Sequence, residues 1–145
     1  MVRGSCFCGG VRYEADQVAV MSHCHCVVCR KTSGAAFATW AHVEPRYFRF
    51  VQGEQLVKKH HHAEGMGREF CGVCGSPVPG KPEHMTSWSI PAGTLDDDPE
   101  VRPVAHVFVS SRAHWWTIGD DLPQFEKWAP GFEPPFARKG ASQSD

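Results

Sequence analysis

Apolar residues along this chain recur in short alternating runs, each bounded by glycine, proline or polar residues. Such alternation is typical of a strand with one buried face. The segment 35–43 fits a strand or a short helix, and we favour a strand. The runs at 48–53 and 55–62 flank Gly53 and Glu54, which predicts a β-hairpin. The segments that we expect to contain strands are 9–15, 35–43, 48–53, 55–62, 67–78, 85–93 and 104–111.

Helical periodicity is weak, and the segment 26–34 is the place where we expect one short helix, ended by Gly34. Regularly spaced short strands predict a mainly β domain. A chain of 145 residues favours a single domain, which we expect to span residues 1–130. Residues 131–145 are rich in proline and then polar, so we expect a tail that is partly mobile.

The charge is nearly balanced, with 15 basic and 16 acidic residues and a net charge of −1. This balance argues against nucleic acid or an anionic membrane as the main partner. The sequence has no apolar run of a membrane-spanning length and no signal-peptide pattern at its start. We therefore expect a cytoplasmic protein, in which thiols stay reduced.

Seven cysteines in a reducing compartment need a role other than disulfide formation. Zinc binds four thiolates tetrahedrally, and two cysteines with one or two residues between them can occupy neighbouring positions around the ion. The pairs Cys6/Cys8 and Cys71/Cys74 both lie among glycines that allow tight turns, so together they predict one structural zinc site. The alternatives are a disulfide framework, or a redox role for one of the pairs.

The remaining thiols, Cys24, Cys26 and Cys29, form a set of three. Three protein ligands and an open position are typical of a catalytic or exchangeable zinc. The alternative is that a histidine closes the site and makes it structural; the candidates are His23, His25 and His106. The sequence therefore predicts two zinc ions per chain, one structural and one functional.

Four ordered segments resemble the glutathione-dependent formaldehyde-activating enzyme family. "GSCFCGGVRYEA" is similar to the family's opening G-x-C-x-C-G-x-V, and "CHCVVCRKTSGAAF" to its C-H-C-x-x-C-R segment. "FCGVCGSPV" resembles F-C-x-x-C-G-S, and "HVFVSSRAHWWTIGDDLPQFEKW" resembles the block that begins H-[IV]-x-V-x-S and ends D-x-L-P-x-F. All seven cysteines lie within these segments, at the positions where the family's pattern has cysteine.

The resemblance implies a β-tent fold, in which small antiparallel sheets surround the four-cysteine zinc site. It also implies that Cys24, Cys26 and Cys29 hold a zinc associated with glutathione. The implied activity is that of a carbon–sulfur lyase, which forms or cleaves S-hydroxymethylglutathione or a related small thiol adduct. Glutathione would be the co-substrate and an aldehyde the other partner.

We expect the proton transfers of this reaction to involve His25 or His106. Arg30, Arg112 and Trp115 are the residues that we expect to contact glutathione, the arginines through its carboxylates. We expect a monomer or a homodimer. The alternative function is a non-enzymatic binding module stabilised by zinc, or a carrier of glutathione or of its aldehyde adduct.

Overall fold

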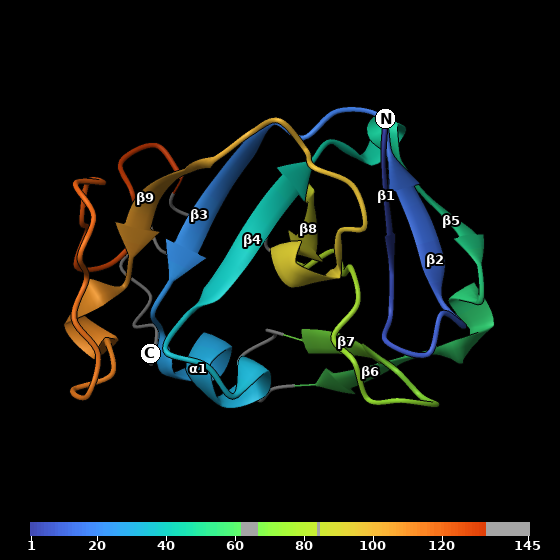
Figure 1. Ribbon diagram of the computed structural model, residues 1–145, viewed down its shortest axis with the longest axis horizontal. Coiled ribbons are helices and arrows are strands. Elements are labelled where there is room, and N and C mark those ends of the chain that lie inside the picture. The colour runs from blue at the N-terminus through green and yellow to red at the C-terminus, as the bar shows by residue number, and fades with distance from the viewer. Residues whose placement is uncertain (62–66, 84, 133–145) are drawn as a thin grey trace.

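The computed structural model describes residues 1–61, 67–83 and 85–132. Its described part is mainly β, with small sheets, a single α-helix, and short 3-10 helices between strands (Figure 1). The strands are β1 (Val2–Ser5), β2 (Arg12–Ala15), β3 (Val20–Cys24), β4 (Ala38–Val43), β5 (Phe48–Gln52), β6 (Val57–His61), β7 (Gly67–Cys71), β8 (Trp88–Pro91) and β9 (Pro103–Val107). The helices are α1 (Val27–Ser33), η1 (Pro45–Tyr47), η2 (Glu54–Leu56), η3 (Ala92–Thr94) and η4 (Val109–Ser111).

The strands form three sheets in the orders β1-β2-β5, β8-β4-β3-β9 and β6-β7. In Figure 1 the first two sheets stand side by side, and the β6–β7 pair and α1 lie across their lower ends. Pairing is antiparallel except between β3 and β9, which run parallel. This arrangement of small sheets confirms the mainly β prediction.

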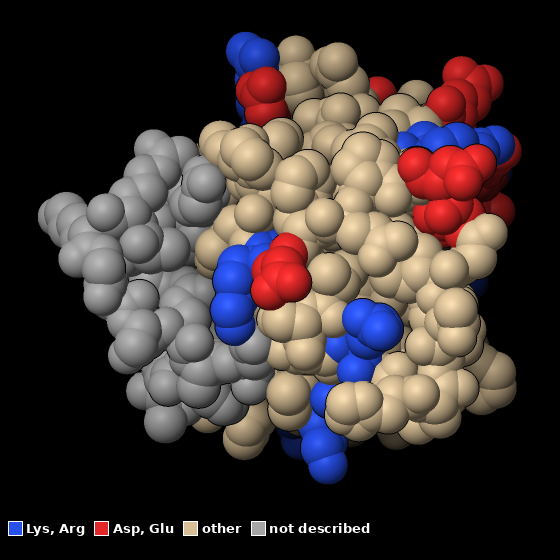
Figure 2. All heavy atoms as spheres, turned by 90° about the vertical axis from the view of Figure 1, so that its left-hand side faces the viewer, with Lys and Arg blue, Asp and Glu red and all other residues tan. Residues whose placement is uncertain are grey.

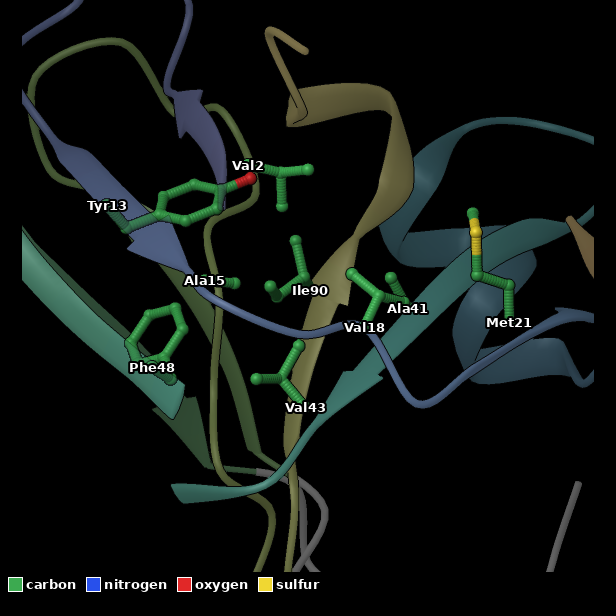
Figure 3. Close-up of a cluster of buried hydrophobic side chains, with 9 residues drawn as sticks. All are labelled: Val2, Tyr13, Ala15, Val18, Met21, Ala41, Val43, Phe48 and Ile90. Carbon is green, nitrogen blue, oxygen red and sulfur yellow. The ribbon is translucent and has the colours of Figure 1, made fainter. Parts of the chain in front are cut away.

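The main core lies between the two larger sheets. Figure 3 shows side chains from β1, β2 and β5 directed toward side chains from β4 and β8. Tyr13 and Ile90 are almost completely buried in it, and the Tyr13 hydroxyl is hydrogen-bonded to Thr94 Oγ1 at 2.6 Å. Phe48 stacks on Trp88 at the edge of this core, with ring centroids 4.2 Å apart. Apolar burial of this kind holds the two sheets together.

The helix α1 follows the predicted segment closely. Cys26 is its N-cap, and the Cys26 sulfur accepts a hydrogen bond from the backbone N–H of Cys29 at 3.3 Å. Gly34 ends the helix in a left-handed conformation at φ 66°, and its N–H donates to the Arg30 carbonyl. Glycine adopts this conformation without the steric cost that a Cβ brings, so the predicted end is confirmed.

The predicted hairpin of 48–53 and 55–62 is wrong. β5 pairs with β2, whereas β6 pairs with β7 in a separate sheet. Gly53 has φ 72°, and the chain then turns through η2. Leu56 and Val57 pack against the buried Cys6 and Cys71 instead of extending the first sheet. Burial beside the cysteines therefore redirects the chain.

The strand predicted over 104–111 is shorter than expected. β9 ends at Val107, because Phe108 takes a left-handed conformation at φ 57° and the chain continues into η4. The side chain of Phe108 is buried against Trp128, with ring centroids 4.9 Å apart. The prediction for 131–145 falls almost entirely outside the described residues.

Charged side chains are dispersed on the face that bears β9. Figure 2 shows basic and acidic groups of both signs scattered over a mostly uncharged surface on this side. The picture agrees with the balanced charge of the sequence. Within the part of the chain that the structure describes, no helix is both long enough and apolar enough to cross a lipid bilayer.

Candidate functional site

The cysteines come together in the two groups that their spacing predicts. The sulfur atoms of Cys6, Cys8, Cys71 and Cys74 all lie within 4.8 Å of one another. So do the sulfur atoms of Cys24, Cys26 and Cys29, which we call the thiol triad. All seven cysteines are free thiols, so the structure holds no disulfide framework.

Two similar turns build the four-cysteine group. In the first, the N–H of Gly9 donates to the Cys6 carbonyl at 2.9 Å; in the second, the N–H of Gly75 donates to the Cys71 carbonyl at 2.8 Å. Both glycines have positive φ, 71° and 76°. Each turn brings its two thiols to one side of the chain. The donor set fits a tetrahedral four-sulfur zinc site.

Cys6 and Cys71 of this group are buried, and they pack with Val11 and Val78 in a core cluster of their own. The pKa of the Cys74 thiol is lowered to about 6, first by a hydrogen bond from the backbone of Ser76. A thiol that ionises readily is a better metal ligand. This group therefore combines packing with a donor set suited to a metal.

The thiol triad lies where β3 runs into α1. Cys24 is the last residue of β3, Cys26 caps α1, and Cys29 lies in its first turn. All three are at least 92% buried, with 8%, 8% and 3% of their surfaces exposed. Among the described residues, no histidine or carboxylate joins the triad in a common cluster.

Two side chains from other strands donate hydrogen bonds to Cys29. The indole Nε1 of Trp40, on β4, lies 3.4 Å from the Cys29 sulfur. The guanidinium Nη2 of Arg68, on β7, lies 3.5 Å from the same sulfur. Arg68 also lies over the Trp40 ring, with its Cζ atom 5.4 Å from the ring centroid. The sequence analysis did not single out either residue.

These donors change the acidity of the triad. The pKa of the Cys29 thiol is held well below its usual value by hydrogen bonds from Cys24 and Cys26, and then by the charge of Arg68 and the Trp40 hydrogen bond. The pKa of Cys24 is raised, because its thiol interacts with the sulfurs of Cys26 and Cys29. One sulfur of the triad is therefore set up to carry negative charge.

The triad borders a cavity of about 760 Å³. Small-molecule sites in proteins typically enclose about 300–1,000 Å³. The floor of the cavity is one face of the β8-β4-β3-β9 sheet, where Ser22, Cys24, Trp40 and His42 line it. Arg68 and Phe70 of β7 also line it. All three thiols of the triad are part of the lining.

One buried donor in this lining has no partner. The Nε atom of Arg68 is enclosed and makes no hydrogen bond to any described residue. Its Nη1 donates to the Gly67 carbonyl at 2.9 Å. A buried donor without a partner costs free energy, and ligands commonly satisfy such groups. Arg68 therefore offers a site for a ligand's acceptor atom beside the triad.

The other predicted site residues lie away from the cavity lining. His25 and His106 are fully buried, with His25 Nε2 and His106 Nδ1 2.8 Å apart. Burial lowers the pKa of His25 to about 4. The Arg30 Nε donates to the Ser111 carbonyl at 3.0 Å. None of these residues lines the cavity.

The two remaining residues expected to contact glutathione also lie outside the lining. The charge of Arg112 contributes to the lowered pKa of His25, and Arg112 is not part of the cavity lining. Trp115 is 74% exposed.

The position of His25 between Cys24 and Cys26 explains why it does not line the cavity. Side chains alternate in direction along an extended chain, so His25 points to the opposite side from Cys24.

Comparisons with known proteins place these features in a family. A search of the curated proteins finds no match. Among solved structures, a crystal structure of a Rhodobacter sphaeroides protein is similar, with a TM-score of 0.57 and 21% sequence identity. The match covers 66% of this chain and 89% of that one, and it concerns the fold alone. Residues 1–111 match the family described as glutathione-dependent formaldehyde-activating enzyme, and the chain belongs to this family.

Proposed function

We propose that this protein is a zinc-dependent carbon–sulfur lyase that forms or cleaves S-hydroxymethylglutathione or a related small thiol adduct. One observation carries the proposal: three buried thiols converge on the wall of a cavity large enough for a small molecule. A module that only binds other proteins has no need of such a cavity. The family is named for enzymes that act with glutathione and formaldehyde.

The triad fits a zinc ion by its chemistry. It offers three soft sulfur donors, and Trp40 and Arg68 direct N–H groups at one of them. Hydrogen bonds to a ligating sulfur are typical of the outer shell of metal sites. Zinc bound there would act as a Lewis acid that favours the ionised form of an incoming thiol. Cys6, Cys8, Cys71 and Cys74 would hold a second, structural zinc.

Arg68 would orient glutathione. The side chain borders the cavity beside Cys29 and holds a buried donor without a partner. A glutathione carboxylate can accept from a guanidinium in a charge-assisted hydrogen bond. We therefore assign carboxylate recognition to Arg68, since Arg30, Arg112 and Trp115 do not line the cavity. Trp40 keeps the guanidinium in place through stacking.

The reaction needs two proton movements and one new bond. The thiol loses its proton to solvent, its sulfur attacks the carbonyl carbon of formaldehyde, and a carbon–sulfur bond forms. The π-electron pair of the carbonyl moves to oxygen, which takes up a proton from solvent. The reverse sequence cleaves the same bond. His25 and His106 lie outside the cavity lining, so this scheme draws no proton from them.

An exchange experiment tests the proposal. NMR exchange spectroscopy on an equilibrium mixture of glutathione, formaldehyde and the adduct measures the rate of interconversion. We expect the zinc-loaded protein to accelerate exchange in proportion to its concentration, and the Cys26→Ser variant to lose the acceleration. Phe7→Ser serves as a control, because Phe7 is 92% exposed and outside the cavity lining.

Two outcomes count against the enzyme. Glutathione that binds without any acceleration of exchange identifies a carrier. Zinc K-edge absorption that shows no additional sulfur on adding glutathione removes the basis for thiol activation. Either result overturns the lyase assignment while leaving the family membership intact.

A further inference from the structure

A separate group of metal-binding side chains lies on the face of the β8-β4-β3-β9 sheet that turns away from the cavity. His23 on β3 and His106 on β9 are register partners, with ring centroids 4.8 Å apart. The carboxylate of Asp120 approaches His106 Nε2 with both oxygens, at 2.9 and 3.1 Å. Ligand atoms of all three residues lie within 4.8 Å of one another.

Each member of this group is held by a partner outside it. His23 Nδ1 is hydrogen-bonded to Thr39 Oγ1 at 2.8 Å, and His106 Nδ1 to His25 Nε2 at 2.8 Å. The Asp120 Oδ1 accepts from the backbone N–H of Leu122 at 3.0 Å. In metal sites the ligating imidazoles are oriented in this way through their second nitrogen. Without a metal, His106 Nε2 donates to Asp120; a metal ion would replace this proton and bind Nε2 of His106 together with the carboxylate. In His23, Nε2 is the nitrogen that does not contact Thr39.

The hydrogen bond between His25 and His106 is compatible with a metal ligand. A metal at His106 Nε2 requires that the proton of this imidazole reside on Nδ1. His25 Nε2 then serves as the acceptor, as either ring can take either role. The His25 proton then resides on its buried Nδ1, which has no partner among the described residues, so metal binding at His106 has to offset the cost of that donor.

The surroundings combine enclosure with access. The His106 side chain is fully buried, and Phe37 packs edge-on against both histidines of the group, at 4.7 and 5.9 Å between centroids. The Asp120 side chain is 45% exposed. An ion can thus enter from the carboxylate side and complete its coordination with water.

We propose that His23, His106 and Asp120 form a third metal site, distinct from both thiol groups, for a first-row divalent transition metal. Two imidazoles with one carboxylate suit iron, cobalt, nickel or zinc better than magnesium or calcium, which prefer all-oxygen donors. The group also carries one negative charge, which offsets part of the charge of the ion. The competing account is a hydrogen-bonded polar cluster that binds no metal.

Cobalt(II) added to protein that carries two zinc ions per chain, enough to fill only the two thiol groups, tests this site. Cobalt bound to thiolates gives intense charge-transfer absorption, whereas cobalt bound to nitrogen and oxygen does not, so the spectrum reports any metal that enters the thiol groups. We expect one cobalt per chain without that absorption, together with paramagnetic broadening of the His23 and His106 imidazole resonances in NMR spectra. His42, which lines the cavity face, should stay less affected.

Variants give the decisive comparison. Asp120→Asn and His23→Gln each remove a proposed ligand. Loss of even an outer partner at a metal site costs about 10- to 100-fold in affinity, so we expect each variant to weaken cobalt binding by at least about tenfold. Thr39→Val should weaken it by about tenfold. Asp121→Asn, which alters the neighbouring exposed carboxylate, should bind like the wild type. Equal affinity in Asp120→Asn and Asp121→Asn, or cobalt detected only with thiolate absorption, overturns the proposal.

Discussion

The indole N–H of Trp40 donates a hydrogen bond to the sulfur of Cys29 at 3.4 Å, so β4 supports the thiol triad from the neighbouring strand. Neutralising part of the charge on a thiolate makes it easier to keep ionised. This contact also fixes the position of the sulfur against the sheet.

The first prediction concerns this contact. Trp40→Phe keeps an aromatic ring but removes the donor, and we expect zinc affinity at the triad to fall by about tenfold. Competition with a chromophoric chelator measures the affinity, and the four-cysteine site should stay unchanged. Trp115→Phe alters an exposed indole and is the matched control. A zinc affinity of the triad that is the same in Trp40→Phe and the wild type would contradict the role of the hydrogen bond.

The second prediction concerns Arg68 and rests on the proposed function. Arg68→Met removes a charged donor, and a hydrogen bond to a charged group is worth about 1.5–3 kcal/mol. We therefore expect the Kd for glutathione to rise by roughly 10- to 100-fold. Arg68→Lys should restore little, because lysine lacks the planar stacking surface that lies over Trp40. Isothermal titration calorimetry measures both variants.

A thiol without a carboxylate is the control for Arg68. With zinc kept in excess so that the triad stays loaded in both proteins, the affinity for 2-mercaptoethanol should be similar in wild type and Arg68→Met, since this ligand has no group for the guanidinium to bind. Arg46→Met changes an exposed arginine paired with Glu44 and should leave both affinities unchanged. Equal losses for glutathione and 2-mercaptoethanol would show that Arg68 supports the triad rather than the carboxylate.

Much of this architecture follows from local sequence features. The spacing of the cysteines is enough to separate them into a group of four and a group of three, because cysteines with one or two residues between them can bind a common ion. The end of α1 at Gly34 is also local, since it depends on one residue's backbone freedom. Such features require no knowledge of which strands pair.

The contacts that complete the site depend on pairing and could not be predicted in this way. Trp40 reaches Cys29 because β4 pairs with β3 in the register that places Ala38 opposite Cys24. Arg68 arrives on the β6–β7 pair, which the predicted hairpin of 48–53 and 55–62 placed in the wrong sheet. Alternation and composition do not determine which distant strand lies opposite.

The third prediction concerns pH. Burial lowers the pKa of His42 from 6.5 to about 4. As the pH falls below 6.5 the unfolded chain binds a proton at His42 and the folded protein does not, so stability decreases between pH 6.5 and pH 4. At 1.36 kcal/mol per pKa unit, this contribution approaches about 3 kcal/mol at the lower end.

Urea unfolding at a series of pH values measures the effect. His42→Gln lacks the titrating group, so its free energy of unfolding should decline less than that of the wild type between pH 6.5 and pH 4. Above pH 7 the free energies of the two proteins should change with pH in parallel. Zinc release at low pH affects both proteins equally, so the difference between their free energies of unfolding at each pH reports His42 alone. Parallel curves throughout would show that the folded protein protonates His42 as readily as the unfolded chain does.

The fourth prediction concerns the core between the sheets. Ile90 is fully buried at its centre, between residues of β2 and β4 (Figure 3). Ile90→Ala should lower the free energy of unfolding by about 2–5 kcal/mol, through lost burial and the cavity that remains. Val51→Ala, on a half-exposed side chain of β5, should stay within about 0.5 kcal/mol. Thermal and urea unfolding provide both values.

The last prediction separates the roles of the two thiol groups. Cys71 is fully buried and joins turns that are more than sixty residues apart, together with Cys6. Metal bound there contributes directly to folding, so Cys71→Ser should leave the chain unfolded or strongly destabilised. Cys26→Ser keeps an oxygen at the N-cap of α1, where serine is a favoured residue, and should stay folded while losing thiol binding.

Circular dichroism, zinc content and glutathione titration on the two variants test this division of roles. We expect Cys26→Ser to keep the wild-type spectrum and to bind one zinc ion fewer per chain than the wild type, and we expect Cys71→Ser to lose both the spectrum and the metal of the four-cysteine group. Addition of a strong chelator to wild type should reproduce these effects in sequence, with thiol binding lost before the fold. Equal unfolding of both variants would mean that the triad is structural, because the chain would then need both groups in order to fold.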